Sequence, residues 1–185
     1  LAGCLALTAL RPSGRQGRVR RRFLSAVTPE GLSFCTETAA AVCGRVYVLE
    51  DSYGLAPALL QRVLEQALQL GQTCLVCYTP LQPDGAPAHL LVPGAGAAFV
   101  ASSPDFPYAG ERCCTLELDG TLPPAARDTL HFARDTAGTL LRKAAEHVRE
   151  AKRIHDELEA LCRPYVDFAA ADALTERTLH ELFPA

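Results

Sequence analysis

Short apolar runs and one amphipathic stretch dominate the first half of the chain. The segments 45–49 (RVYVL) and 73–78 (TCLVCY) are rich in β-branched and aromatic residues, which predicts two strands. Between them, apolar residues recur at helical spacing over 57–70. Pro57 suits the first helical position and Gly71 suits the C-terminal cap. The order of strand, helix and strand predicts a βαβ unit with parallel strands.

Further elements are predicted on both sides of this unit. Three short strands are expected over 89–93, 96–103 and 114–118. Upstream, Thr28 followed by Pro29 and Glu30 is typical of a capped helix start and predicts a short helix ending at Ala41. We therefore expect residues 1–19 to be a linker or the end of an upstream fragment, and residues 20–123 to form an α/β body.

After residue 123 the pattern becomes helical and continues to about Arg163, with Gly138 as a potential break. At 1.5 Å per residue this helix would be roughly 60 Å long, so it must project from the body or fold back. Residues 124–185 are expected to form a C-terminal helical arm. Its apolar seam alternates spacings of four and three, as in helices that pack on another helix. The seam consists of Ala137, Leu141, Ala144, Val148, Ala151, His155, Leu158 and Cys162.

The net charge and two short motifs bear on whether the protein binds nucleic acid or a membrane and on where it is located. The formal net charge of −3 gives no reason to expect nucleic acid, and the basic run Arg15–Arg22 is interpreted as a solvated, flexible lead-in. The segment Leu1–Cys4 (LAGC) has the form of a lipoprotein cleavage box but lacks the preceding basic and apolar regions. The HDEL at His155–Leu158 is internal and therefore no retention signal. We expect a cytoplasmic protein without a membrane partner.

Candidate metal ligands are few. Cys74 and Cys77 lie three apart on a predicted strand, so their side chains should point to opposite faces and cannot easily share a metal ion. Cys113 and Cys114 are adjacent and have no matching pair at zinc-ligand spacing. His155 is followed by Asp156 and Glu157, but such neighbours diverge around a helix, which favours a packing histidine. No catalytic or metal-binding residue is predicted.

The turn after the strand 45–49 occupies the place of a phosphate-binding loop. Such a loop, G-x-x-x-x-G-K-[ST], turns backbone N–H groups toward the phosphates, neutralises them with lysine and binds Mg²⁺ through the hydroxyl. Here proline replaces the lysine and removes a backbone donor, and an aspartate replaces the first glycine. On its own this pattern favours an ordinary tight turn. The candidate nucleotide-binding window consists of Asp51, Ser52, Tyr53, Gly54, Leu55, Ala56, Pro57 and Ala58.

Five segments around this turn carry a family resemblance. They are 22–31 (RFLSAVTPEG), 78–84 (YTPLQPD), 89–94 (HLLVPG), 99–106 (FVASSPDF) and 151–168 (AKRIHDELEALCRPYVDF). Together they resemble a bacterial family of uncharacterised P-loop ATPase-like proteins built from two tandem halves. The resemblance covers about residues 20–170 and best suits one half, the C-terminal one. It implies a three-layer α/β P-loop NTPase-like fold with a mostly parallel sheet.

Two departures from this family concern its nucleotide machinery. The glycine, lysine and serine of its phosphate loop fall on Asp51, Pro57 and Ala58. A second family segment ends a strand with aspartate and histidine, and here residues 100–105 read VASSPD, which retains only the proline. Because both losses lie on separate segments, we expect a domain that has kept the fold and lost the chemistry.

Three functions stay open. The first is a degenerate, non-catalytic half that supports an intact P-loop half in the same or another chain. The second is an ATP-binding domain in which Gly54 and the helix N-terminus hold an anion, and only this function would require ATP and Mg²⁺ as cofactors. The third is a helical interaction module carried by the arm.

Overall fold

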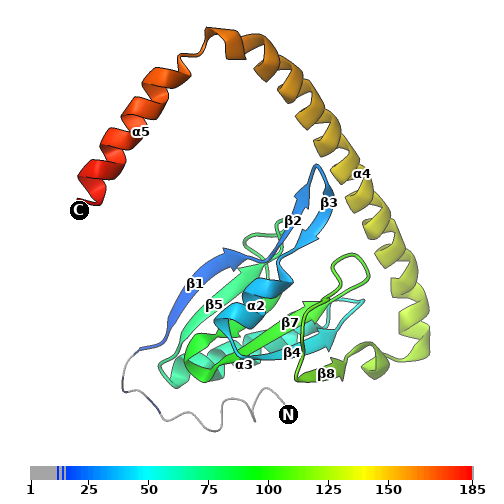
Figure 1. Ribbon diagram of the computed structural model, residues 1–185. Helices are drawn as coiled ribbons and strands as arrows, with labels where there is room; N and C mark the ends of the chain where they lie inside the picture. The colour runs from blue at the N-terminus through cyan, green and yellow to red at the C-terminus, as the bar shows by residue number, and fades with distance from the viewer. Residues whose placement is uncertain (1–11, 13, 15, 185) are drawn as a thin grey trace.

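Figure 1 shows the computed structural model of the chain, in which residues 12, 14 and 16–184 are described. A six-stranded sheet forms the centre of the body, a two-stranded hairpin extends from it, and a long helical arm follows. Within the described residues, no helix combines the length and the apolar character needed to cross a membrane. The Leu1–Cys4 motif lies outside the described residues.

The sheet is mostly parallel, as predicted. Its strand order is β1-β5-β6-β7-β4-β8, and only β6 runs against its two neighbours. The other five strands end at the same edge, which is called here the C-terminal edge of the sheet. The bounds are β1 Arg18–Phe23, β4 Arg45–Glu50, β5 Thr73–Tyr78, β6 His89–Val92, β7 Ala97–Ser102 and β8 Cys114–Glu117.

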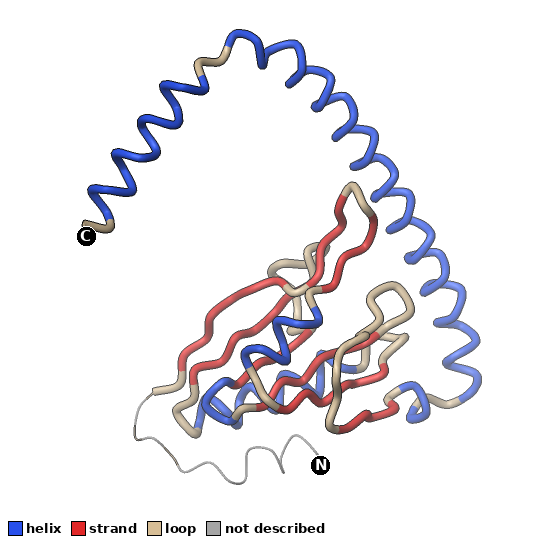
Figure 2. The backbone as a smooth tube through the Cα atoms, viewed as in Figure 1, coloured by secondary structure: helices blue, strands red, loops and turns tan. Residues whose placement is uncertain are grey.

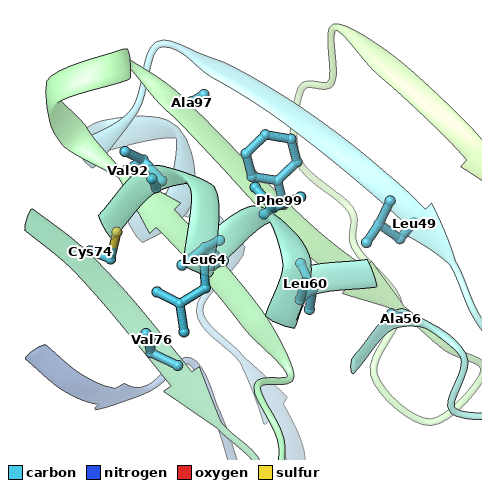
Figure 3. Packing of buried hydrophobic residues seen from close by; sticks show 12 residues of the cluster. Leu49, Ala56, Leu60, Leu64, Cys74, Val76, Val92, Ala97 and Phe99 are labelled. Atoms are coloured by element: carbon cyan, nitrogen blue, oxygen red, sulfur yellow. The ribbon is translucent and has the colours of Figure 1, made fainter. Parts of the chain in front are cut away.

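The predicted strand–helix–strand unit is present as β4, helix α3 (Ala56–Gln69) and β5. The two strands are parallel but are not neighbours, because β7 and β6 lie between them. The apolar stripe of α3 packs on one face of the sheet, as Figure 3 shows. This core cluster includes Leu60, Val63, Leu64, Ala67, Cys74, Val76, Leu90 and Phe99.

The opposite face of the sheet is covered in part by the short helix α2 (Thr36–Val42). Strand residues alternate between the two faces, so Cys74 belongs to the cluster under α3 and Cys77 to the cluster under α2. Two helix layers around one sheet make the body a three-layer α/β unit. The second cluster includes Ala39, Cys43, Val46, Val48, Cys77, Leu91 and Val100.

The predicted helix between Thr28 and Ala41 is wrong in its first half. Strands β2 (Ser25–Thr28) and β3 (Gly31–Phe34) form an antiparallel hairpin, and the helix begins only at Thr36. Proline in the second and glycine in the fourth position of a turn favour a chain reversal, which Pro29 and Gly31 provide. The Thr28 hydroxyl donates to the Gly31 carbonyl at 3.0 Å, so it closes this turn instead of capping a helix.

The interpretation of the basic run Arg15–Arg22 as a flexible lead-in is also wrong for its second half. Arg18 begins strand β1, which pairs in parallel with β5 along the edge of the sheet. All six β1 residues are exposed, which explains why their side chains look like those of a solvated segment. The backbone is nevertheless ordered by the ladder to β5, and arginines are a common feature of edge strands.

The arm consists of α4 (Pro124–Cys162), a short 3-10 turn (Arg163–Tyr165) and α5 (Phe168–Leu182). Figure 2 shows α4 as one continuous helix that passes the C-terminal edge of the sheet and the β2–β3 hairpin before it leaves the body. The suggested break at Gly138 does not occur. Gly138 is buried against Asp105, and a Cβ atom there would lie only 2.8 Å from a carboxylate oxygen of Asp105. The glycine therefore permits close packing.

The face of α4 that contacts the body differs from the predicted seam. Gly138 and Ala145 are buried, and Arg134 and Leu141 are half-buried, so only Leu141 belongs to the predicted set. The seam was defined by apolar character, whereas the contact with the body depends on small residues that allow close approach. Beyond Arg149, whose Nε donates to the Pro29 carbonyl at 2.9 Å, every described residue of the arm is exposed.

Candidate functional site

The turn between β4 and α3 is closed by its own aspartate. Asp51 is only 7% exposed, and its carboxylate accepts N–H groups from Tyr53 at 3.2 Å, Leu55 at 2.8 Å and Ala56 at 2.7 Å. The Asp51 N–H in turn donates to the Ser102 carbonyl at the end of β7, 2.9 Å away. Two of the three amides are those of Leu55, the N-cap residue, and Ala56, the first residue of α3, so a negative charge sits at the positive end of the helix dipole.

A second carboxylate takes another amide of this turn. Asp119, in a 3-10 turn (Asp119–Thr121) after β8, accepts the Ser52 N–H at 2.8 Å. Gly54 has a φ of +78°, so the turn needs a residue that tolerates the left-handed region. The amides that a phosphate loop would direct at its ligand are therefore directed at carboxylates of the chain itself.

The eight residues of the predicted window, Asp51 to Ala58, do come together as one strand-to-helix turn at the C-terminal edge. Pro57 lies in the first turn of α3, where its missing N–H leaves no gap in the helix. Ala58 is exposed on α3 and offers no hydroxyl group. The preceding acid, Glu50, is half-buried and lies 3.6 Å from the Arg112 guanidinium.

A cavity of about 330 Å³ lies beside this turn. One wall is the turn itself, the second is the loop after β7 and the third is α4, so the arm partly covers the edge where ligands of open α/β sheets usually bind. The lining residues are Ser52, Tyr53, Gly54, Ser103, Pro104, Asp105, Leu130, Ala133, Arg134 and Ala137.

Arg134, which lines this cavity, and Arg142, which pairs with the lining residue Asp105, already have acidic partners. The Arg134 guanidinium lies 5.9 Å from the centre of the Tyr53 ring and 2.6 Å from Asp135. The hydrogen bond from Arg134 lowers the pKa of Asp135 and raises the pKa of Arg134 itself. Arg142 pairs with Asp105 at 3.1 Å across the boundary between α4 and the body. Neither arginine is left to balance an incoming phosphate.

The segment 100–105, the second expected difference from the resembled family, forms the end of β7 and a tight loop. The Ser102 hydroxyl accepts the Tyr108 N–H at 3.2 Å, and the Ser103 hydroxyl accepts the Phe106 N–H at 3.3 Å. These short contacts stabilise the loop. The oxygens are used in local structure and do not point to a ligand.

Three of the described cysteines, Cys43, Cys74 and Cys77, are buried core residues. Burial raises the pKa of Cys74 to about 11 and that of Cys77 to about 12, so both thiols are protonated near neutral pH. The prediction that they point to opposite faces is confirmed by their places in separate core clusters. Cys113 is exposed and Cys114 is half-buried at the start of β8.

His155 lies on the exposed part of α4. Its Nδ1 is 3.8 Å from Asp156, whereas Glu157 points elsewhere and pairs with Arg153. Among the described residues, one group has the spacing of metal ligands: His155, Asp156 and Glu159. All three are exposed and Asp156 already binds Lys152 at 2.7 Å, so nothing beyond their proximity indicates a metal ion.

Two polar residues with a functional potential were not predicted from the sequence. Asp119 follows a parallel strand and so reaches the same edge as Asp51, a signal that could have been used once β8 was placed beside β4. His89 is buried in β6, where its Nδ1 accepts the Ala101 N–H at 3.1 Å and its ring stacks on Phe34. Burial lowers the pKa of His89 to about 4. No pattern in the sequence indicates this environment.

Comparisons with protein-family models, with curated proteins and with solved structures found no match to this chain.

Proposed function

We propose that this chain is a non-catalytic P-loop NTPase-like domain that serves as the structural or regulatory half beside an intact P-loop half in the same or another chain. The observation that carries the proposal is the Asp51 carboxylate, which accepts three backbone N–H groups at the start of α3. In a working phosphate loop those groups bind the nucleotide. Here the chain supplies its own anion.

The surrounding charges support the same conclusion. A nucleotide phosphate at this turn would lie among Glu50, Asp51 and Asp119, and the nearby arginines are paired with other acids. To bind there, the phosphate would have to displace the Asp51 carboxylate, which is part of the chain and is already hydrogen-bonded to the three amides. Electrostatic stabilisation is the main contribution that phosphoryl-transfer enzymes make, so a site with reversed charge is unsuited to that reaction.

The test is to follow the melting temperature of the full chain while ATP and Mg²⁺ are added to millimolar concentration. A ligand that binds the folded state raises the melting temperature with its concentration. We expect no rise for the natural sequence. A concentration-dependent rise would contradict the proposal and support the alternative of an ATP-binding domain with an atypical loop.

A variant makes the test specific to the turn. Asp51→Ala removes the acceptor of three N–H groups, and we expect a loss of stability on the order of 3 kcal/mol. Inorganic phosphate should then stabilise this variant more than it stabilises the natural chain, because the amides are free. Asp84→Ala, at an exposed ion pair with Arg21, is the control for general salt effects. Equal phosphate responses in all three proteins would show that Asp51 does not occupy an anion site.

The exposed apolar side chains of the arm favour a second candidate function, a helical interaction module with the body as its scaffold. Ile154, Leu158 and Leu161 on α4 are 54%, 58% and 72% exposed. Deleting residues 125–168 together with α5 should abolish any association while the body keeps its fold. Unchanged association after this deletion would exclude the arm as the interaction element.

A further inference from the structure

A hollow of about 880 Å³ lies at the start of β1 and β5, at the edge of the sheet opposite the turn after β4. Its walls include Arg18 and Arg20 from β1 and Leu75 from β5. Leu75 packs against the core cluster under α2, and Arg20 is its partner in the β1–β5 ladder. The hollow is therefore on the same face of the sheet as α2.

This face of the sheet lacks a second helix in the described structure. Helix α2 contacts β4 and β7, whereas Figure 1 shows no helix beside it over β1 and the first half of β5. Sheets of this class normally have helices along both faces, so the part of this face next to the hollow is open to a further helix. What remains open there is the aliphatic side of Leu75 and the stems of the arginines.

The hollow is basic. Arg18, Arg20 and Arg22 follow one another on this face of β1, and no carboxylate of the described residues lies within ion-pair distance of them. Arg21 differs, because it is on the other face, over the Tyr78 ring and beside Asp84. An occupant that fits this surface should bring apolar side chains flanked by acids.

Helix α5 has this composition. At 100° per residue, its apolar stripe covers about 140° of the helix surface. Asp172 and Glu176 lie beyond one border of the stripe, by about 20° and about 60°, and Glu181 lies about 20° beyond the other, while His180 is on the opposite side of the helix. The stripe consists of Phe168, Ala171, Leu174, Thr175, Thr178, Leu179 and Leu182.

Nothing in the described structure covers this stripe. Every residue of α5 is exposed, with Leu174 at 57% and Leu182 at 67%. The two threonine hydroxyls bond to carbonyls of the preceding helical turn, Thr175 to Ala171 and Thr178 to Leu174, so they could be buried without losing a partner. An isolated helix of this length is marginal in water, and packing would stabilise it.

The α5 of the same chain cannot reach the hollow. Arg149 makes the last contact of α4 with the body, at Pro29 near the C-terminal edge of the sheet. From there α4 continues for about 20 Å, and α5 is only about 22 Å long, at 1.5 Å per residue. If α5 folds back along α4, it returns only to the level of Pro29, whereas the hollow is at the opposite edge.

We propose that the α5 helix of a second copy of this chain docks in the hollow between β1 and β5. Its apolar stripe faces Leu75 and the arginine stems, and Asp172 and Glu176 pair with Arg18 and Arg20. Exchange of α5 between two copies makes the contact reciprocal, as in a two-fold dimer. The inference is independent of the function of the turn after β4.

The test is the mass of the full chain by sedimentation equilibrium over a wide concentration range. We expect a monomer–dimer equilibrium. The double variant Arg18→Glu, Arg20→Glu should raise the dissociation constant at least about tenfold, because acids then face acids. The double variant Asp172→Arg, Glu176→Arg should do the same. A mixture of the two double variants should form heterodimers, since both contacts between α5 and β1 then pair opposite charges.

The matched control is His180→Glu, on the far side of α5, which should leave the dissociation constant unchanged. All exchanged side chains are exposed, and circular dichroism checks that each variant keeps its helix content. A chain that stays monomeric at all concentrations overturns the proposal, as does a dimer that ignores both charge reversals. Failure of the mixed variants to associate overturns the pairing of α5 with β1.

Discussion

Helices α3 and α5 have nearly the same length, 14 and 15 residues, and both are amphipathic, but their surroundings are opposite. Helix α3 buries Leu60, Val63, Leu64 and Ala67 against the sheet, and α5 buries none of its residues. A helical pattern of apolar residues therefore predicts the helix without identifying what it packs on. Helix α3 therefore contributes to the stability of the body, whereas α5 offers an apolar surface for association.

The same contrast holds between the two edges of the sheet. At the C-terminal edge, the backbone amides of the turn and the arginines beside it are bound by Asp51, Asp119, Asp105 and Asp135. At the other edge, Arg18 and Arg20 of β1 lack acidic partners among the described residues, whereas Arg21 on the other face pairs with Asp84. The polar groups are therefore paired within the chain where a ligand would be expected, and Arg18 and Arg20 lack an acid where no helix of the described structure covers the sheet.

The largest effect should come from matched leucine truncations in the two helices. Leu60→Ala should lower the free energy of unfolding by about 2–5 kcal/mol, because Leu60 is fully buried and a cavity would remain. Leu179→Ala, at a side chain that is 52% exposed, should change it by less than about 0.5 kcal/mol in dilute solution. Urea denaturation followed by circular dichroism measures both. Equal losses would mean that α5 is part of the same cooperative unit.

A pH experiment should separate a body histidine from an arm histidine. The pKa of His89 is lowered to about 4 from an ordinary value of 6.5, so the unfolded chain binds the proton more readily than the folded one. Stability should fall as the pH drops from about 6.5 toward 4, by up to about 3 kcal/mol, and be fully present above pH 6.5.

The control variants identify the residue responsible. His89→Asn can still accept the Ala101 N–H but does not titrate, so the difference between this variant and the natural chain isolates the histidine. His155→Gln, on the exposed surface of α4, should retain the pH dependence of the natural chain. A pH profile that is the same with and without His89 would contradict the assignment.

Local pattern predicted most of the body. The strands β4 and β5 and the helix α3 follow from β-branched runs and from 3.6-residue periodicity, because both depend on which face each residue presents to the core. The same reasoning missed β1, since an exposed edge strand of arginines has no buried face to leave a pattern. Thr28 was likewise predicted to be a helix cap, although Pro29 and Gly31 favour a hairpin turn equally well.

The candidate site was only half predictable. Its position follows from the order of strand, glycine-containing turn and helix, and the sequence shows that the turn has no lysine. That Asp51 binds the amides itself could not be predicted, because an aspartate there could equally point into solvent. Asp119 comes from a segment far along the chain, and its contact with Ser52 depends on the placement of β8 beside β4.

At the boundary between body and arm, Gly138→Val should lower the free energy of unfolding by about 1–2 kcal/mol. A side chain there would meet the Asp105 carboxylate, which is held by Arg142. Part of this cost is offset, because valine is a better helix former than glycine. Ala144→Val, at an exposed position of the same helix, is the control. Increased amide exchange in the α4 region around Gly138 would confirm that contact with the body is lost. Unchanged exchange and stability would contradict it.

The smallest effect should come from ion pairs on the two parts of α4. Arg142→Gln breaks a pair with Asp105, whose side chain is only 20% exposed, and should cost about 0.5–1 kcal/mol. Arg153→Gln breaks pairs with Glu150 and Glu157 that are more than half exposed on the arm, and should cost less stability than Arg142→Gln. The difference arises because the Asp105 pair joins two elements and is less exposed to solvent, whereas the Arg153 pairs join neighbouring turns of one helix. Added salt should weaken both sets of ion pairs. A larger loss of stability for Arg153→Gln than for Arg142→Gln would contradict the conclusion that the outer arm contributes least to the stability of the molecule.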